Sequence, residues 1–442
     1  MKHKPTTIPF PGNNPTFLVT WLGQVVSLVG SGLTSFALGV WVFERTGSPT
    51  LFAYIGLFAV LPKVFFSPAA GALVDRFDRR KIMILSDTGA GLSTLFISLM
   101  IFSGRLELWH IYLSAAANAL CGTFQWPAYS ASVAQLVPQE RLSRANGMIQ
   151  FGRAAAEIFS PLLAGTLMVS IQLEGVILID VVTFFFAIFT LLTVRFPQLE
   201  NKPARIKPSN FKAEMTFGWR YIQTHRGLLN LLLFLLVVNF LWGIVGALIV
   251  PMILSFTSSE ILGTIITIAG AGMLTGSILM SVWGGPKRRV RGIIFFELIS
   301  GVCFMLMGFR PNFWLVAVGA FGAHLTIAIV YGLNQTIWQT IVEPENHGRV
   351  FAAQQMFRSF TTPIAYLSAG PLAEKLIEPL IASKGMLSLK LTALVGSGAG
   401  RGIGLIFVLM GLVKIMISIS AFLNPRIRLI EAKAPHASTT DW

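Results

Sequence analysis

The chain has 442 residues, of which 54% are hydrophobic and only 12% are charged, and its mean hydropathy is +0.70. This composition leaves too little polar surface for a soluble protein of that length and predicts a polytopic membrane protein. The net charge of +15 is explained by basic loops that face the cytoplasm, so we expect no nucleic-acid partner.

Apolar runs long enough to cross a bilayer, about 20 residues each, recur from the N-terminus onward. The first run follows Lys2 and Lys4 and lacks a convincing cleavage site, so we expect an uncleaved helix. In the first half of the chain the helices are predicted at 17–43, 51–73, 82–103, 108–131, 147–170 and 174–194. In the second half they are predicted at 229–255, 260–283, 292–309, 313–340, 349–380 and 402–423.

We therefore predict an all-α fold of twelve transmembrane helices in two pseudo-symmetric halves, residues 1–194 and 229–425. The segment 195–228 is polar and contains three prolines, which indicates a cytoplasmic linker, and an amphipathic helix is expected within it at 211–224. Residues 426–442 are predicted to form a cytoplasmic tail. Cys121 and Cys303 both lie in apolar runs, so no disulfide framework is expected.

Basic residues select one orientation of the helices, because short basic loops stay in the cytoplasm. With both termini inside, most of the 34 Lys and Arg residues fall on the cytoplasmic side, and four lie within helices: Lys63, Arg153, Arg358 and Lys414. The external loops hold only Arg45, Arg105, Arg310, Lys375, Lys384, Lys390 and Arg401. We expect a multi-pass protein of the cell membrane, present as a monomer.

An internal repeat supports a duplicated architecture. A shift of 205 positions pairs several identical residues: Gly71 with Gly276, Val137 with Val342, Glu140 with Glu345, Arg144 with Arg349, Gln150 with Gln355, Arg153 with Arg358, and Gly165 with Gly370. Repeated halves of this kind place a substrate site at their interface and move against each other, which favours a carrier over a channel or a membrane enzyme.

The loop from Gly71 to Lys81, with the sequence GALVDRFDRRK, resembles the loop signature of the major facilitator superfamily between helices two and three. Ser160 to Gly165 resembles the antiporter signature of exporters, although Ser160 and Ala164 replace glycines. Gly23 to Ser27, Leu61-Pro62 and the loop itself resemble the macrolide-efflux and enterobactin-exporter branch. The resemblance covers nearly the whole chain and implies secondary transport.

The same loop supplies the predicted gating residues, which are Gly71, Asp75, Arg76, Arg79, Arg80 and, from the second half, Gly276. Glycines let helices approach closely, although an ordinary packing role is equally open. Asp75 lies at the membrane boundary, where it could meet the positive end of helix eleven, and the second half has Met280 at the corresponding position. The arginines could instead act only as topology determinants. Asp87 is expected close to the cytoplasmic boundary, paired with the basic loop.

Charges inside the helices are the candidates for proton coupling, because each is costly there unless paired or hydrated. Glu157 and Arg153 lie four residues apart and either neutralise each other or bind and tune the coupling proton. Asp180 is a further candidate, although helix six is peripheral in the superfamily, which favours a structural role. Lys63 either neutralises one of these acids or contacts an anionic group of the substrate.

Polar and aromatic residues at mid-membrane depth mark the predicted substrate cavity, because facing lipid would be costly for them. Interhelical hydrogen bonding is the alternative role for many. The predicted set is Gln24, Asn118, Gln125, Trp126, Asn239, Trp242, His324, Tyr331, Asn334 and Gln335. Aromatic surfaces with sparse hydrogen-bonding groups suit amphipathic ligands better than sugars or amino acids.

Together these features predict an exporter of amphipathic small molecules, of drug or macrolide type, that exchanges them for protons by alternating access. A dedicated exporter of an endogenous metabolite such as a siderophore, an uptake symporter, and a non-transporting receptor or scaffold remain alternatives. No phosphate-binding loop or metal-ligand pattern is present, so we expect no cofactor and no metal.

Overall fold

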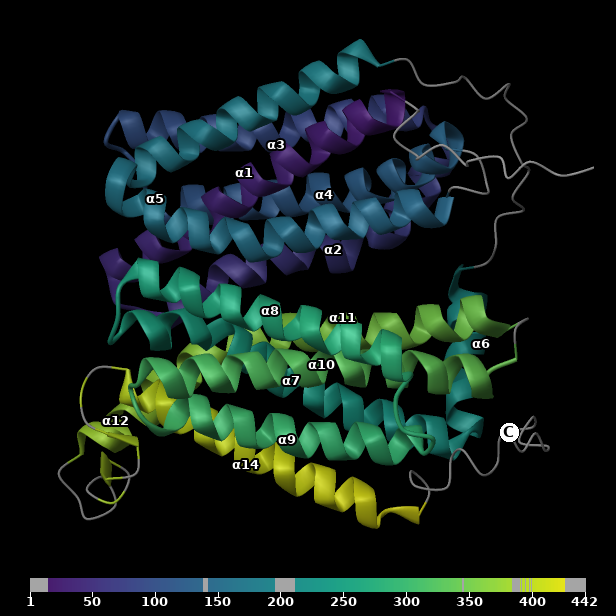
Figure 1. Ribbon diagram of the computed structural model, residues 1–442, viewed down its shortest axis with the longest axis vertical. Helices are drawn as coiled ribbons and strands as arrows, with labels where there is room; N and C mark the ends of the chain where they lie inside the picture. The colour runs from purple at the N-terminus through teal and green to yellow at the C-terminus, as the bar shows by residue number, and fades with distance from the viewer. Residues whose placement is uncertain are drawn as a thin grey trace, which may run out of the picture. The chain divides into compact units, whose positions relative to one another are not determined.

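A computed structural model describes residues 15–137, 142–194, 211–343, 346–383, 390, 392–393, 395–396, 398 and 400–425. Nearly all of these residues are helical, and none lies in a strand, as Figure 1 shows. The chain forms two compact units. Unit 1 comprises Met1–Gly39 and Phe58–Ala204, and unit 2 comprises Val40–Leu57 and Arg205–Trp442.

Unit 1 is built from the first five helical elements. They are α1 (Pro15–Thr46), α2 (Pro49–Arg76), α3 (Arg79–Phe102), α4 (Leu108–Leu136) and α5 (Leu142–Thr193). The C-terminal end of α1 and the N-terminal part of α2 belong to unit 2. Gln172 has φ 57° and ψ −172° and divides α5 into two helices, at the point where the sequence predicts a loop. The ribbon of α5 turns back on itself in Figure 1.

Unit 2 contains the linker helix α6 (Phe211–Thr224) and the remaining helices. These are α7 (Arg226–Leu254), α8 (Ser259–Trp283), α9 (Arg289–Phe309), α10 (Phe313–Ile341), α11 (His347–Pro371), the π-helix η4 (Leu372–Ile377), α12 (Glu378–Ala382) and α14 (Arg401–Leu423). Within this unit α9 packs against both α10 and α14, and α8 packs against α10 (Figure 1).

The count of twelve transmembrane helices is confirmed when α5 is taken as two helices and α11, η4 and α12 as one continuous helical segment. Within the described residues, nine helices are long and apolar enough to span a membrane on composition alone. The exceptions among the long helices are α4 and α11. Both carry many small and polar residues, including Asn118 and Gln125 in α4 and Gln354 and Arg358 in α11.

The predicted amphipathic linker helix is also confirmed, with the expected bounds. Its apolar side packs onto α11, where the ring of Trp219 lies 4.7 Å from that of Phe357, and Ile222 is fully buried. Residues 195–210 and the predicted tail, residues 426–442, lie outside the described part of the chain.

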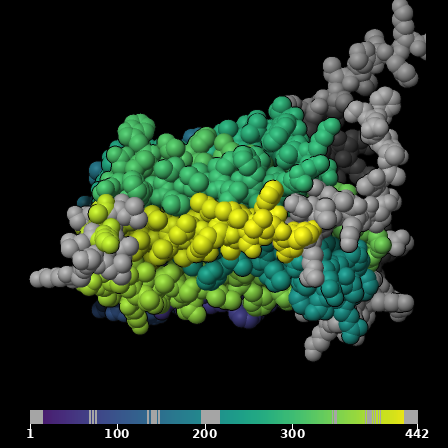
Figure 2. All heavy atoms as spheres, turned by 90° about the horizontal axis from the view of Figure 1, so that it is seen from below, coloured from purple at the N-terminus to yellow at the C-terminus, as the bar shows by residue number. Residues whose placement is uncertain are grey.

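The outward face of α14 is apolar and exposed. Leu409, Leu412, Met416, Ile419 and Leu423 recur every three or four residues and are each at least 37% exposed. This spacing puts them on one side of the helix, which runs along the surface of unit 2 in yellow in Figure 2. In a chain that spans a membrane, such a strip faces lipid.

Residues 40–57 belong to unit 2 because their loop is tied to η4. The backbone N–H of Thr50 donates to Glu374 Oε1 at 3.0 Å, and its hydroxyl donates to Oε2 at 2.7 Å. The Ser48 hydroxyl also donates to Glu374 Oε1. The compact units therefore divide the chain differently from the predicted ranges at this loop, and the predicted domain ranges remain a prediction.

Candidate functional site

A buried cluster of one carboxylate and two amides lies in unit 1. Gln24 on α1 donates from Nε2 to Asp87 Oδ2 on α3 at 2.9 Å. Gln125 on α4 donates from Nε2 to Asp87 Oδ1 at 2.7 Å and to Gln24 Oε1 at 2.8 Å. Asp87 is 9% exposed and Gln24 is 7% exposed. Three helices thus converge on one carboxyl group through neutral side chains.

The expectation that Asp87 pairs with the basic loop is wrong. The hydrogen bonds that the structure describes for its carboxylate come from Gln24 and Gln125 instead. The reason is geometric: α3 starts at Arg79, so Asp87 lies two turns inside the helix, about 12 Å from its start at 1.5 Å per residue.

The basic loop makes contacts that stabilise helix ends. Asp78 is the N-cap of α3, because its side chain accepts from the backbone N–H groups of Arg80 and Lys81. The Arg80 guanidinium donates to the carbonyl oxygens of Leu191 and Leu192 at 3.0 to 3.1 Å, where the last turn of α5 leaves carbonyls without helical partners. Both contacts lie within unit 1.

The remaining gating candidates are only partly described. Gly71, Asp75 and Arg76 lie in the last turns of α2, and the structure describes their backbone but not their side-chain surroundings. Gly276 on α8 is in tight contact with α10, since a Cβ atom added there would lie 2.3 Å from the carbonyl oxygen of Leu325. The gating role of these residues stays a prediction.

Asp180 is surrounded by hydroxyl groups. Ser31 Oγ donates to Oδ1 at 3.4 Å, Thr94 Oγ1 donates to Oδ2 at 3.2 Å, and Asp180 is 2% exposed. Gly30 faces the same carboxylate, because an added Cβ would lie 2.8 Å from Oδ1. The second arm of α5 therefore packs against α1 and α3 through this residue.

Arg153 and Glu157 line a hollow beside α1 and α5, together with Leu28 and Ser160. The Arg153 guanidinium lies 4.3 Å from the ring centroid of Trp126, which is 38% exposed. Among the described residues the structure contains one ion pair, and it does not join Arg153 to Glu157. The two charges thus face one hollow without neutralising each other directly.

Lys63 lies at the middle of α2 and its side chain is exposed. Its charge interacts with that of Arg153, and the two positive charges repel each other. The structure therefore gives Lys63 a basic neighbour in unit 1 where one of the sequence interpretations expects an acid.

The cavity candidates of unit 2 form two aromatic contacts and several hydrogen bonds. The Trp242 ring lies edge-on to His324 at 5.3 Å and to Phe304 at 4.9 Å. Asn239 donates to Thr361 Oγ1 and to the carbonyl of Arg358 at 3.2 Å. The Arg358 guanidinium lies 5.8 Å from the ring of Tyr331, which is 59% exposed.

Other candidates are more enclosed. Asn334 is 4% exposed and accepts from Trp338 Nε1 at 3.0 Å, and Gln335 next to it is half-buried. In unit 1, Asn118 donates to Ser93 Oγ at 3.1 Å and to the Ser114 carbonyl at 3.0 Å. These bonds satisfy polar groups between helices, which is the alternative role that the sequence leaves open.

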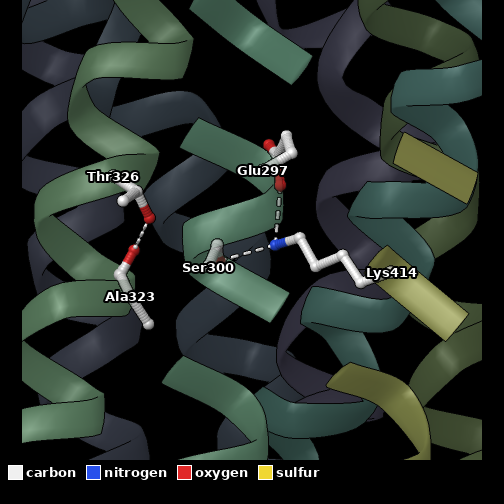
Figure 3. Close-up of polar contacts among 5 residues, drawn as sticks. All are labelled: Glu297, Ser300, Ala323, Thr326 and Lys414. Atoms are coloured by element: carbon white, nitrogen blue, oxygen red, sulfur yellow. Dashed lines mark hydrogen bonds and ion pairs between the residues drawn. The ribbon is translucent and has the colours of Figure 1, made fainter. Parts of the chain in front are cut away.

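A buried ion pair on α9 and α14 is a feature that sequence reasoning missed. Lys414 Nζ lies 2.7 Å from Glu297 Oε2 and donates to Ser300 Oγ at 2.7 Å, as Figure 3 shows. It also lies over the rings of Phe304, at 4.5 Å, and Trp242, at 5.0 Å. The available signal was depth: Glu297 lies about 18 Å from the end of α9, and Lys414 about 20 Å from the start of α14.

No cluster of three or more His, Cys, Asp or Glu side chains suited to a metal ion occurs within the part of the chain that the structure describes.

Comparisons with known proteins agree with this architecture. The chain is 29% identical over 365 residues to macrolide efflux protein A of Streptococcus pyogenes, covering 81% of this chain and 90% of that protein. It is 30% identical over 315 residues to macrolide efflux protein A of Enterococcus faecalis, covering 70% of this chain and 97% of that protein.

A solved structure has the same fold. A bacterial homologue of the human lysosomal transporter Spinster, in an inward-facing and unoccupied conformation, matches with a TM-score of 0.70 and 14% identity, covering 96% of this chain and 98% of that one. The sequence model of the Major Facilitator Superfamily matches residues 20–366. The chain therefore belongs to the major facilitator superfamily of membrane transporters.

Proposed function

We propose that the protein exports amphipathic small molecules, of drug or macrolide type, across the cell membrane by alternating access, in exchange for protons. The observation that carries this proposal is the set of exposed aromatic side chains beside polar groups within spanning helices, such as Trp126 with Arg153. Such surfaces suit large apolar ligands that carry a few polar groups. The similarity to two proteins named macrolide efflux protein A supports export as the direction of transport.

Proton exchange is the proposed energy source, because no described feature provides for nucleotide binding. An exporter of this kind needs a group that takes up and releases a proton, and the predicted candidates are the carboxyl groups of Glu157 and Asp180, with Arg153 tuning the proton affinity of Glu157. Glu157 and Arg153 support this role by facing one hollow unpaired with each other. Asp180 supports it by being buried among hydroxyls.

Inside-out vesicles with an imposed pH gradient test transport and coupling together. With the interior acidic, we expect vesicles that contain the protein to accumulate erythromycin or ethidium, and a protonophore to abolish the accumulation. Vesicles without the protein, under the same gradient, are the control for passive trapping. Accumulation that persists with the protonophore would reject proton coupling, and loss of cargo from the vesicles would reverse the proposed direction.

Competition between cargo molecules in the same vesicles distinguishes a broad exporter from a dedicated metabolite exporter. A broad pocket predicts that erythromycin, ethidium and a catecholate siderophore inhibit one another, whereas a dedicated exporter moves only one of them.

The proposed orientation places both termini in the cytoplasm, and the proposed active form is a monomer.

The gate proposal predicts a large effect of Asp75→Asn. We expect this change to reduce export at least tenfold, because it removes the charge proposed to hold the cytoplasmic side closed against the positive end of α11. Asp78→Asn is the matched control: it makes the same chemical change three residues away, and asparagine caps a helix as well as aspartate does. Full activity of Asp75→Asn would favour the receptor or scaffold alternative.

A further inference from the structure

We propose that Asp87 is a further proton-binding site of this transporter, beside the candidates that the sequence predicts, and that Gln24 and Gln125 position its carboxyl group. The inference rests on the proposed function, since a coupling proton has a role only in a proton-driven carrier. Asp87 is not among the residues that the sequence predicts for proton coupling, which are Glu157, Arg153 and Asp180.

The first argument is depth. Gln24 lies about 14 Å from the start of α1, Asp87 about 12 Å from the start of α3, and Gln125 about 16 Å from the end of α4. By the charge-based topology these three helix ends lie on one side of the membrane. The cluster therefore lies well inside the hydrocarbon region, which is about 30 Å thick.

The second argument is the absence of a compensating charge. The partners of the Asp87 carboxylate are the amide of Gln24 on α1 and the amide of Gln125 on α4, and the Cys121 thiol of α4 is also close. Within the described side chains, no Lys, Arg or His of α1, α4 or α5 pairs with it. A buried charge without a counter-ion is costly, and a bound proton removes that charge.

The third argument is the balance of donors and acceptors. The two hydrogens of the Gln125 amide are used on Asp87 and Gln24, while Gln125 Oε1 is buried and has no donor among the described groups. The ionised carboxyl only accepts, whereas the protonated form adds an O–H donor. A proton on Asp87 thus supplies the kind of group that the cluster lacks.

The fourth argument links the proton to cargo. Gln125 is followed by Trp126, whose ring supports Arg153 at the edge of the α1–α5 hollow. A cargo group that donates a hydrogen bond to Gln125 Oε1 would take the place of the O–H donor that protonated Asp87 supplies, and would thereby favour proton release from the carboxyl. The step itself is simple: the carboxylate gains a proton from the external side and releases it to the cytoplasm.

The proton site is tested first without cargo. Infrared difference spectra recorded during a pH titration of the purified protein in lipid nanodiscs are expected to show the band of a protonated carboxyl. The contribution of Asp87 to this band should be lost in Asp87→Asn and kept in Asp78→Asn. A band that is unchanged in Asp87→Asn would overturn the proposal, whether or not any cargo is transported.

Transport provides the second test. In inside-out vesicles, Asp87→Asn is expected to lower erythromycin accumulation driven by the pH gradient at least tenfold, while exchange of erythromycin across the membrane without a gradient is retained. Failure of the wild-type vesicles to accumulate any panel compound would instead contradict the proposed function. Full gradient-driven accumulation by Asp87→Asn, or wild-type accumulation driven by a sodium gradient alone, would overturn the inference.

A second variant guards against misfolding. Gln125→Leu keeps the carboxyl and removes its Nε2 donor, so we expect the midpoint of the infrared titration to move to another pH. If Asp87→Asn does not fold, an unmoved midpoint in Gln125→Leu would overturn the positioning role and, with it, the proposed site.

Discussion

Replacing Lys414 with methionine is expected to lower the free energy of unfolding by about 3–5 kcal/mol, because Glu297 would then keep a buried charge without a partner. Lys414 is fully buried and Glu297 is 2% exposed, so water cannot take the place of the lost ammonium group. The Ser300 hydroxyl alone remains close to the site, and a single hydroxyl compensates little of that charge.

The double variant Glu297→Leu with Lys414→Met is the critical control. Burying an ion pair costs roughly as much as the pair returns, so replacing both residues with apolar ones is expected to restore most of the lost stability. The measurement is chemical or thermal unfolding of the protein in detergent micelles. If the double variant were as unstable as the single one, the positive charge itself, lying over Phe304 and Trp242, would be the stabilising element.

The number and position of the helices could be predicted from the sequence because they depend on local patterns. Each apolar run is long enough to span a bilayer, and the break at Gln172 and the amphipathic helix α6 both follow from composition along the chain. The π-helix η4 could not be predicted, because it occurs inside one continuous helical segment that follows Pro371.

The candidate site could be predicted only in part. The sequence gives the depth of a side chain along its helix, but it does not say which neighbouring helix that side chain faces. Gln24 and Gln125 were identified as polar residues at mid-membrane depth, yet their contact with each other and with Asp87 depends on how α1, α3 and α4 pack. The partnership of Glu297 with Lys414 likewise requires knowing that α9 lies beside α14.

Helix packing also bears on the role of Gly276, for which the sequence leaves two roles open. Gly276 and Gly272 both face the backbone of α10: an added Cβ would lie 2.3 Å from the carbonyl oxygen of Leu325 or of Phe321, respectively. Backbone atoms cannot rotate away as the end of a flexible side chain can. A larger residue at either position therefore has to push α8 away from α10.

Gly276→Val is accordingly expected to lower the free energy of unfolding by about 3 kcal/mol, which is the upper part of the usual range for overpacking. The matched control is Gly122→Ala on α4, where an added Cβ would meet nothing within 4 Å. That change should leave stability unchanged or raise it by up to about 1 kcal/mol, because alanine favours the helix over glycine. Unfolding in detergent micelles measures both variants.

The two roles of Gly276 predict different results from the same variant. If Gly276 is a packing glycine, Gly276→Val lowers the midpoint of unfolding. Any loss of export per folded molecule then accompanies this loss of stability. A gating glycine predicts wild-type stability with lost export, because the close approach would then be needed only in one conformation of the transport cycle. The contact with the Leu325 carbonyl, already formed in this structure, favours the first result. Wild-type stability of Gly276→Val would contradict it.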